Sequence, residues 1–228
     1  WDGTSWTEVN NMNIQRAFCS GAGLVTAALA MGGESQATPH AELTATESWD
    51  GTCWAEVSAL NAKRSSGAGC GIQTSALYFG GNVQVPPNPP GYQTVTEAWN
   101  GSTWAEVANL GSEHGSSPDG FGIQTAAVCA GGGSIPGKIA ITEEFTVPSG
   151  AVSIVQEGQV WYNTTSTVLK GYAQAGTGAW ASGTPLNTAR GFASGVGTQT
   201  EAIVYGGTAG PPGRLDVTEK YDGTTWTE

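Results

Sequence analysis

The segment that decides the fold is residues 64–81, Arg-Ser-Ser-Gly-Ala-Gly-Cys-Gly-Ile-Gln-Thr-Ser-Ala-Leu-Tyr-Phe-Gly-Gly. Its second half, residues 74–79, is short, β-prone and bounded by glycine, which is typical of a buried strand of roughly five residues. Its first half, residues 65–69, contains only small residues, which indicates close approach of neighbouring backbones. We therefore expect two adjacent strands that end in a Gly-Gly pair.

This segment belongs to a repeat. Matching copies occupy residues 16–33, 114–132 and 190–207, and each ends in Gly-Gly. A variable loop follows, then a Thr-Glu pair, then an aromatic residue two positions after the glutamate: Trp49, Trp99, Phe145 and Tyr221. Fixed order around a variable loop predicts a repeat architecture, because loops absorb insertions and strands do not.

A second tryptophan ends each unit. An Asp-Gly or Asn-Gly turn leads to Trp54, Trp104 and Trp226, and the same phrase precedes Trp6. The separation is ten residues in Trp6 to Arg16, Trp54 to Arg64, Trp104 to His114 and Trp180 to Arg190. The Asp-Gly turn supplies the positive φ angles of a tight hairpin. Four short strands per unit predict an all-β protein, a β-propeller of four-stranded antiparallel blades.

These units resemble kelch-type blades: an arginine near the first strand, Gly-Gly after the second, an aromatic-Asp-Gly turn, and a tryptophan in the outer strand. Phrases such as Gly-Ile-Gln-Thr-Ser-Ala-Leu-Tyr-Phe-Gly-Gly and Leu-Asn-Thr-Ala-Arg resemble the kelch-like repeats of virion and tail-fibre proteins of marine cyanobacterial tailed phages. The segment from Glu157 to Asn163, with residues 168–172, resembles a short module that stands before such propellers. The resemblance covers roughly 85% of the chain, and it implies a virion or extracellular location.

The third unit departs from the pattern. His114 replaces the arginine, and about 30 residues intervene between Phe145 and Trp180. We divide the chain into kelch-like repeats at 1–145, an insertion at 146–179 and a fourth repeat at 180–228. In one interpretation Trp180 marks the missing outer strand and residues 152–172 form a hairpin or degenerate blade. In the other, one propeller ends near residues 147–150 and a second begins.

The number of blades is also open between four and five. Four sets of inner strands accompany five tryptophan-bearing outer strands, so one outer strand is surplus. We expect a five-bladed ring slightly ahead of a four-bladed one. Unpaired strand edges invite pairing with another molecule. We therefore predict a homo-oligomer or larger assembly joined through the terminal outer strands.

Composition excludes several classes of protein. Hydrophobic residues make up 39% and charged residues only 12%, which fits a packed interior and excludes a helical bundle. The net charge of −11 argues against nucleic acid, whose binding needs clustered Lys and Arg. No apolar run reaches the roughly 18 residues of a membrane-spanning helix. The chain opens on Trp1 without a leader pattern, so we expect no targeting segment, in either a processed product or a piece of a longer protein.

Most charged side chains recur with the repeat, which indicates structural roles. The recurring carboxylates follow Trp (Glu8, Glu56, Glu106, Glu228), follow Thr (Glu47, Glu97, Glu143, Glu219) or lie in turns (Asp2, Asp50, Asp222). We expect them to accept backbone N–H groups or to pair with the repeated arginines. Arg16, Arg64 and Arg190 are predicted to form buried or half-buried forks between blades.

The remaining reactive residues indicate neither a metal nor a cofactor. Cys19, Cys53, Cys70 and Cys129 lack Cys-x-x-Cys spacing, and we expect free thiols in or near the core. His40 and His114 have no second histidine nearby in sequence. No nucleophile elbow, P-loop or zinc-protease motif occurs. Carboxylates outside the repeat, the only candidates for a catalytic pair, are Glu34, Glu42, Glu113 and Asp119. We predict that the protein is not an enzyme.

Recognition is expected on the variable loops that follow Gly-Gly, because in a propeller these loops share one face. Residues predicted to bind there are His40, Pro87, Asn88, Tyr92, Pro136, Pro211 and Arg214. The repeat tryptophans are expected in blade cores and interfaces, with a sugar-stacking platform as the alternative. The sequence thus predicts a structural or adhesive propeller of a virion appendage, fibre or surface layer. The alternative function is a lectin-like module that binds cell-surface glycans.

Overall fold

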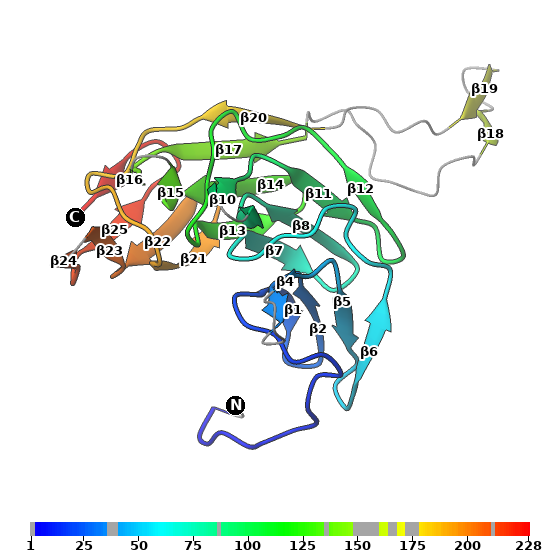
Figure 1. The fold of residues 1–228 in the computed structure, drawn as a ribbon. Coiled ribbons are helices and arrows are strands. Elements are labelled where there is room, and N and C mark those ends of the chain that lie inside the picture. Colours follow the sequence, from blue (N-terminus) through cyan, green and yellow to red (C-terminus); the bar gives the residue numbers. More distant parts are fainter. Residues whose placement is uncertain are drawn as a thin grey trace.

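In the computed structural model the described residues are 3–35, 41–85, 88–134, 137–147, 160–163, 168–171, 178–210 and 213–228. These residues form strands, turns and bends, with no helix among them. The predicted all-β class is therefore confirmed. Four-stranded antiparallel sheets recur four times in the described chain, in the propeller-like arrangement of Figure 1.

Each four-stranded sheet keeps its strands in chain order, as expected for a blade, with a short hairpin between its second and third strands. Sheet 1 has β1 (Ser20–Leu24), β2 (Ala27–Met31), β5 (Thr46–Trp49) and β6 (Trp54–Val57). Sheet 2 has β7 (Ala68–Ile72), β8 (Ser75–Phe79), β11 (Thr96–Trp99) and β12 (Trp104–Glu106). Sheet 3 has β13 (Asp119–Ile123), β14 (Ala126–Ala130), β17 (Thr142–Thr146) and β20 (Ala179–Ser182). Sheet 4 has β21 (Ser194–Thr198), β22 (Glu201–Tyr205), β25 (Thr218–Tyr221) and β26 (Trp226–Thr227).

Sheet 3 takes its outer strand from beyond the insertion. β20 pairs with β17, and Trp180 lies opposite Phe145, as the first interpretation of the third unit expects. Within the insertion, β18 (Val160–Asn163) pairs with β19 (Val168–Gly171) as a hairpin. Sheet 4 then continues the same series, because β13 of sheet 3 lies against β21.

A short hairpin follows each Gly-Gly pair. The hairpins are β3 (Glu34–Ser35) with β4 (Ala41–Glu42), β9 (Asn82–Val85) with β10 (Asn88–Tyr92), β15 (Gly133–Ser134) with β16 (Gly137–Lys138), and β23 (Thr208–Gly210) with β24 (Gly213–Arg214). An isolated bridge ties the base of each hairpin to the segment that enters its sheet, as in Ala17 with Glu34 and Ser65 with Asn82. The hairpins differ in sequence, but each is held to its sheet by the same bridge.

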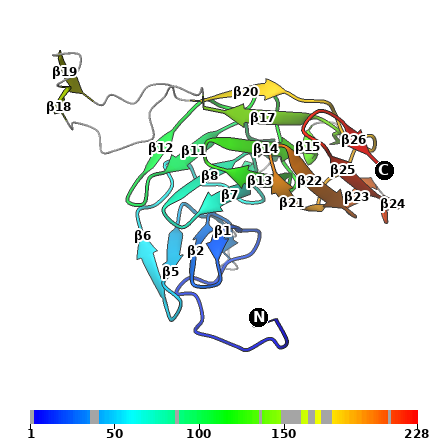
Figure 2. The same ribbon diagram turned by 180° about the vertical axis from the view of Figure 1, so that it is seen from behind.

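The innermost strands of successive sheets lie side by side. β1 packs beside β7, β7 beside β13 and β13 beside β21. Figures 1 and 2 show the resulting arc, which is open between sheet 1 and sheet 4. The described residues form four four-stranded sheets and no fifth. The number of blades in a closed ring therefore stays a prediction.

Hydrophobic layers between the sheets form the core. We call the face that a sheet turns toward the next sheet its leading face and the opposite face its trailing face. The second strand of each sheet turns two residues to the leading face. In sheets 1 to 4 these are Leu29 and Met31, Leu77 and Phe79, Val128 and Ala130, and Ile203 and Tyr205. Those of the trailing faces are Ala28 and Ala30, Ala76 and Tyr78, Ala127 and Cys129, and Ala202 and Val204. Each contact between a leading and a trailing face is a junction, and each of the three junctions buries one cluster of these residues.

Small residues in the inner strands make the close packing feasible. A Cβ added to Gly69 would lie 2.6 Å from Met31 Cε, and one added to Gly120 would lie 2.7 Å from the Ala68 Cβ. At Gly120 a side chain would require a shift of the neighbouring strand, whereas at Gly69 the flexible Met31 side chain could move away. The prediction that neighbouring backbones approach closely at these segments is confirmed.

Candidate functional site

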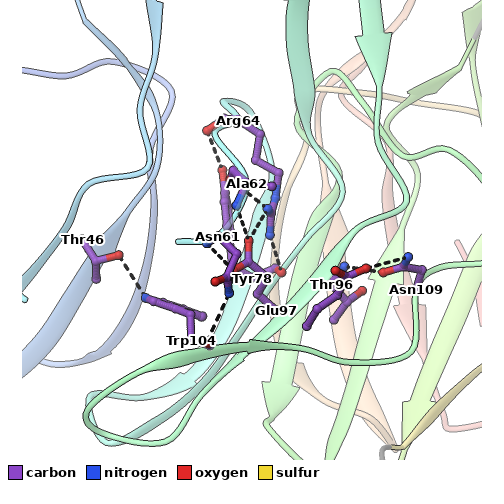
Figure 3. Close-up of polar contacts among 10 residues, drawn as sticks. Thr46, Asn61, Ala62, Arg64, Tyr78, Thr96, Glu97, Trp104 and Asn109 are labelled. Carbon is purple, nitrogen blue, oxygen red and sulfur yellow. Dashed lines mark hydrogen bonds and ion pairs between the residues drawn. The ribbon is translucent and has the colours of Figure 1, made fainter. Parts of the chain in front are cut away.

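A buried ion pair holds each sheet to the segment that enters it. In sheet 2, Arg64 Nη1 donates to Glu97 Oε1 at 2.6 Å, and the Asn61 N–H and side-chain amide donate to Glu97 Oε2 at 2.7 and 2.8 Å. Both ionic side chains are almost fully buried. Figure 3 shows the Arg64 and Asn61 side chains of the entry segment converging on Glu97 of β11. A buried charge is tolerated only when it is paired and hydrogen-bonded in this way.

The same arrangement recurs in the other sheets. Arg16 pairs with Glu47 in sheet 1 and Arg190 with Glu219 in sheet 4, and all four side chains are buried. The expected arginine forks are thus present. Their side-chain bonds stay within one sheet, however, and the neighbouring sheet is reached through the backbone carbonyl, since Gly33 N donates to Arg64 O at 3.0 Å.

His114 takes the place of the arginine in sheet 3. Its Nδ1 lies 2.8 Å from Gly131 O and its Nε2 lies 3.2 Å from Glu143 Oε1. Burial acts to lower the pKa of His114, but Cys129, Glu143 and the Gly131 carbonyl together raise it to about 10. Burial also raises the pKa of the Cys129 thiol, whereas the neighbouring His114 lowers it. The negative partner of the imidazolium is Glu143, as in the Arg–Glu pairs.

The structural interpretation of the repeated carboxylates is confirmed in part. It holds for the glutamates after Thr, and for Asp50 and Asp222, whose Oδ1 atoms each accept two backbone N–H groups of their own turn. These bonds lower the pKa of both aspartates. It is wrong for the glutamates after Trp, which are exposed: Glu8, Glu56, Glu106 and Glu228. Glu56, Glu106 and Glu228 lie on or beside outermost strands, where solvent covers one side of the sheet, and Glu8 lies in no strand. Asp2 lies outside the described residues.

Sequence reasoning missed the asparagine that completes the ion-pair cluster. Asn13, Asn61 and Asn187 each bind the buried glutamate through backbone and side chain, and each side chain also donates to the carbonyl of the outer-strand tryptophan. The signal was available, because asparagine stands three residues before each repeat arginine. Sheet 3 has Gly111 instead, and there the Gly111 and Ser112 N–H groups bind Glu143.

A second set of bonds joins neighbouring sheets at the turn between the two inner strands. Gln124 Nε2 donates to Ala76 O and Trp99 O of sheet 2, and Gln73 Nε2 donates to Trp49 O of sheet 1. Gln199 donates to Phe145 O of sheet 3. In sheet 1 the corresponding residue is Val25, so the trailing side of sheet 1 lacks this amide.

The outer-strand tryptophans also act across junctions. Trp104 Nε1 donates to Thr46 Oγ1 of sheet 1 at 3.1 Å, as Figure 3 shows, and Trp180 Nε1 donates to Thr96 Oγ1 of sheet 2 at 3.0 Å. Trp226 and Thr142 occupy the corresponding places at the third junction, where both atoms are buried without a hydrogen-bond partner. Each of these tryptophans also stacks on the aromatic residue of its own third strand, as Trp104 does on Trp99 at 5.3 Å between ring centroids.

The prediction that the repeat tryptophans lie in cores and interfaces fails at Trp6. Trp54 and Trp180 are half-buried and Trp104 and Trp226 are buried, but Trp6 is 83% exposed and lies in no strand. In the described chain each of the four sheets already has an outer strand, and the segment of Trp6 forms no strand. The surplus outer strand expected from the sequence is therefore absent as a strand.

A cavity of about 890 Å³ lies where the arc is open. Glycines of all four innermost strands line it, together with Trp49 and Trp54 on the trailing side of sheet 1 and Val196 of sheet 4. Cys19 and Cys70 are the titratable side chains among its lining residues. The rest of its lining is apolar side chains and glycine backbone, with the hydroxyl-bearing Thr7 and Ser20.

The leading face of sheet 4 is bare. Val196, Ile203 and Tyr205 are 62%, 37% and 46% exposed. Their counterparts in sheet 2, Cys70, Leu77 and Phe79, are buried against sheet 3. The difference arises because no further sheet among the described residues covers sheet 4.

The loop residues predicted to bind fall on the hairpins. His40, Pro87, Pro136 and Pro211 lie outside the described residues, and Asn88 begins β10. Tyr92 packs on Gly115 of the next unit, where an added Cβ would lie 2.0 Å from its ring, and Arg214 in β24 is exposed. β4 contacts β9 and β16 contacts β23, so the hairpins adjoin in pairs.

The carboxylates proposed for catalysis do not converge on one centre. Glu34 and Glu42 lie opposite each other across the β3–β4 hairpin; Glu42 Oε1 accepts the Gln84 N–H and its Oε2 lies 3.8 Å from Lys63 Nζ. Glu113 is exposed in the segment before His114. Asp119 lies in β13, buried at the junction with sheet 4. Burial raises the pKa of Asp119 to about 7, although Arg190 and the Gly195 N–H lower it.

All four cysteines are free thiols, as expected. Cys70 and Cys129 are buried, and burial raises the pKa of Cys70 to about 12. The prediction of a core position is wrong for Cys19 and Cys53, which are exposed. Cys53 closes the surface turn capped by Asp50, and Cys19 precedes β1 on the open side of sheet 1.

Further findings concern metals, membranes and relatives. In the described ranges, no group of three or more His, Cys, Asp or Glu side chains is arranged to hold a metal ion. The same ranges hold no helix with the length and hydropathy needed to cross a membrane. No protein-family model matches the chain, and no curated protein matches it.

Proposed function

We propose that this protein is a non-enzymatic structural module, a kelch-like β-propeller unit that serves as a building block of a larger assembly. The observation that carries the proposal is how the repeated polar side chains are used. Arg and Asn of the entry segments bind Glu of the third strands, and Gln, Trp and Thr of the junctions bind one another or the backbone. The repeated side chains therefore hold the sheets rigidly together. The faces that remain for partners are the trailing face of sheet 1 and the leading face of sheet 4.

A virion appendage, fibre or extracellular surface layer is the setting we propose. This part rests on the resemblance of the repeats to those of phage virion proteins. The acidic net charge of −11 fits an exposed, well-solvated component.

Assembly can be tested with the 228-residue protein. Sedimentation velocity over a concentration series and negative-stain electron microscopy should show oligomers that grow with concentration. A strictly monomeric species throughout the series would contradict the building-block function.

Carbohydrate recognition is the second candidate, and the hairpins favour it. Their bases are fixed by the same bridge in every unit, while their lengths and sequences differ, which suits a recognition surface on a constant scaffold. A glycan array would test it, with Arg214→Ala as the variant on the hairpin surface and Lys220→Ala, an exposed residue of β25 outside the hairpins, as the control. Binding no stronger than background would remove this candidate and leave the structural function standing.

A further inference from the structure

We propose that the leading face of sheet 4 binds the trailing face of sheet 1 in a second copy of this chain, so that copies join head to tail. The inference rests on the proposed assembly function and names its interface. It differs from the strand-edge pairing expected from the sequence, because the surfaces that meet are sheet faces.

The interface would continue one that the molecule already forms three times. At each internal junction, two apolar residues of a leading face pack on a small residue and a larger one of the next trailing face, as Leu77 and Phe79 do on Ala127 and Cys129. Sheet 4 offers Ile203 and Tyr205 in the leading positions. In the trailing positions sheet 1 has the half-buried Ala28 and the buried Ala30, which is smaller than its counterparts Tyr78, Cys129 and Val204. The two end faces are therefore the two halves of the repeated junction.

Polar groups on the two end faces also match. At internal junctions a Gly-Gly N–H donates to the next arginine or histidine carbonyl, at 3.0, 2.8 and 2.7 Å in turn. In a head-to-tail pair this bond would run from Gly207 N to Arg16 O of the second copy. The Trp-to-Thr bond would run from Trp54 Nε1 to Thr218 Oγ1, since Trp54 and Thr218 hold the places of Trp104 and Thr46.

The end faces differ from the internal ones in ways that add apolar contact. Phe18 and Phe192 are 54% and 51% exposed, whereas sheet 2 has the buried Ser66 at this place. At internal junctions these positions are adjacent, because Ser66 N donates to Phe18 O at 2.9 Å. A head-to-tail pair would bring Phe18 beside Phe192, and Val25 would replace the amide of Gln73. Apolar replacements suit an interface between separate molecules, where buried apolar area drives association.

Gly206 provides a steric probe that acts only in the assembly. A Cβ added to Gly32, Gly80 or Gly131 would lie 2.6 to 2.7 Å from the arginine or histidine carbonyl of the next sheet. A Cβ added to Gly206 has as its nearest neighbour Leu215 O, at 3.7 Å. The residue has the same positive φ, +67°, so an alanine there adds backbone strain to the monomer but clashes only when a second copy covers sheet 4.

Two blocking variants test the geometry by complementation. Ile203→Glu places a charge on the leading face of sheet 4, and Val25→Glu places one on the trailing side of sheet 1. Each variant alone should lose about tenfold or more in self-association by sedimentation velocity. A mixture of the two should form dimers, because each retains one intact end. Ile123→Glu, an exposed isoleucine of sheet 3 outside both end faces, is the matched control and should assemble like the wild type.

The outcomes separate this inference from the function on which it rests. If Gly206→Ala and both glutamate variants assemble like the wild type, the head-to-tail interface is wrong while the assembly function survives. If only Ile203→Glu blocks assembly, and a mixture of the two glutamate variants forms no dimers, then the leading faces of sheet 4 in two copies bind each other. The inference is wrong in that case as well. A wild type that never associates overturns both. Circular dichroism of each variant confirms that a loss of assembly is not a loss of fold.

Discussion

At the scale of single residues, a buried ion pair joins the third strand of a sheet to the segment that enters that sheet. Glu97 is the acceptor on which Asn61, Ala62 and Arg64 converge, and it is fully buried. Its carboxylate joins the segment that enters sheet 2 to the third strand. The same geometry in sheets 1 and 4 shows that the charge pair belongs to the repeat.

The Glu97→Gln variant should therefore unfold at lower denaturant concentration. The substitution leaves the Arg64 guanidinium buried without its counter-charge, which costs roughly 3–5 kcal/mol of unfolding free energy. Glu106→Gln, on the exposed outer strand β12, is the matched control and should unfold like the wild type. Urea denaturation followed by tryptophan fluorescence measures both. Equal midpoints for the two variants would show that the buried pair does not hold the sheet.

Asp119 should make stability depend on pH. Its pKa is raised to about 7 in the fold, so its protonated form is favoured there, and the stability it contributes is present below the unfolded pKa near 4 and lost as pH rises through 7. His114, whose pKa is also raised, loses its contribution between the unfolded value and about 10. Both groups make the unfolding free energy fall as pH rises, so a variant is needed to separate the contribution of Asp119 from that of His114.

Asp119→Asn removes the pH dependence caused by Asp119 and leaves that caused by His114. Between pH 5.5 and 8.5 the unfolding free energy of the wild type should fall relative to the variant by about 2 kcal/mol. Thermal or urea unfolding at several pH values gives this difference directly, and the His114 contribution cancels. A constant difference across the range would mean that Asp119 remains ionised in the fold.

At the scale of elements, the periodic features of the sequence were sufficient to predict the strands. Residues 74–79 were expected as a strand, and β8 begins one residue later and ends at the same residue. β22 occupies the corresponding place in the fourth repeat. The spacing of ten residues from tryptophan to arginine reflects a fixed path from the outer strand of one sheet to the entry of the next. The glutamates after Trp were misjudged because recurrence alone does not distinguish a buried position from an exposed one.

The junction amides give a prediction at this scale. In Gln124→Val the carbonyls of Ala76 and Trp99 lose their donor, so the variant should lose about 1–3 kcal/mol of unfolding free energy. The reciprocal change, Val25→Gln, adds an amide where the described chain places no preceding sheet, and it should leave the monomer unchanged. Differential scanning calorimetry at low concentration compares them. Similar melting temperatures for Gln124→Val and the wild type would show that the amide is dispensable at a junction.

At the scale of the whole molecule, the open arc was beyond the reach of sequence. The repeat predicts that each sheet packs on the next, and three junctions do so. Whether the last sheet meets the first depends on small rotations summed over every junction, and no single residue encodes that sum. For the same reason Trp6 could be assigned to the repeat but not to a sheet.

The open arc predicts a gradient of local stability along the chain. Sheets 2 and 3 are covered on both faces, whereas sheet 1 and sheet 4 each have one end face, and strands with fewer buried contacts open more readily. Amide hydrogen exchange of the dilute monomer should therefore be slowest in β8 and β14 and faster in β22, where Ile203 and Tyr205 are exposed. Raising the concentration should slow exchange in β22 and at Gly207 more than in β8, because assembly covers the end face. Equal protection of β8, β14 and β22 in the dilute monomer would indicate that sheet 4 is already covered, and hence that the arc closes on itself in solution.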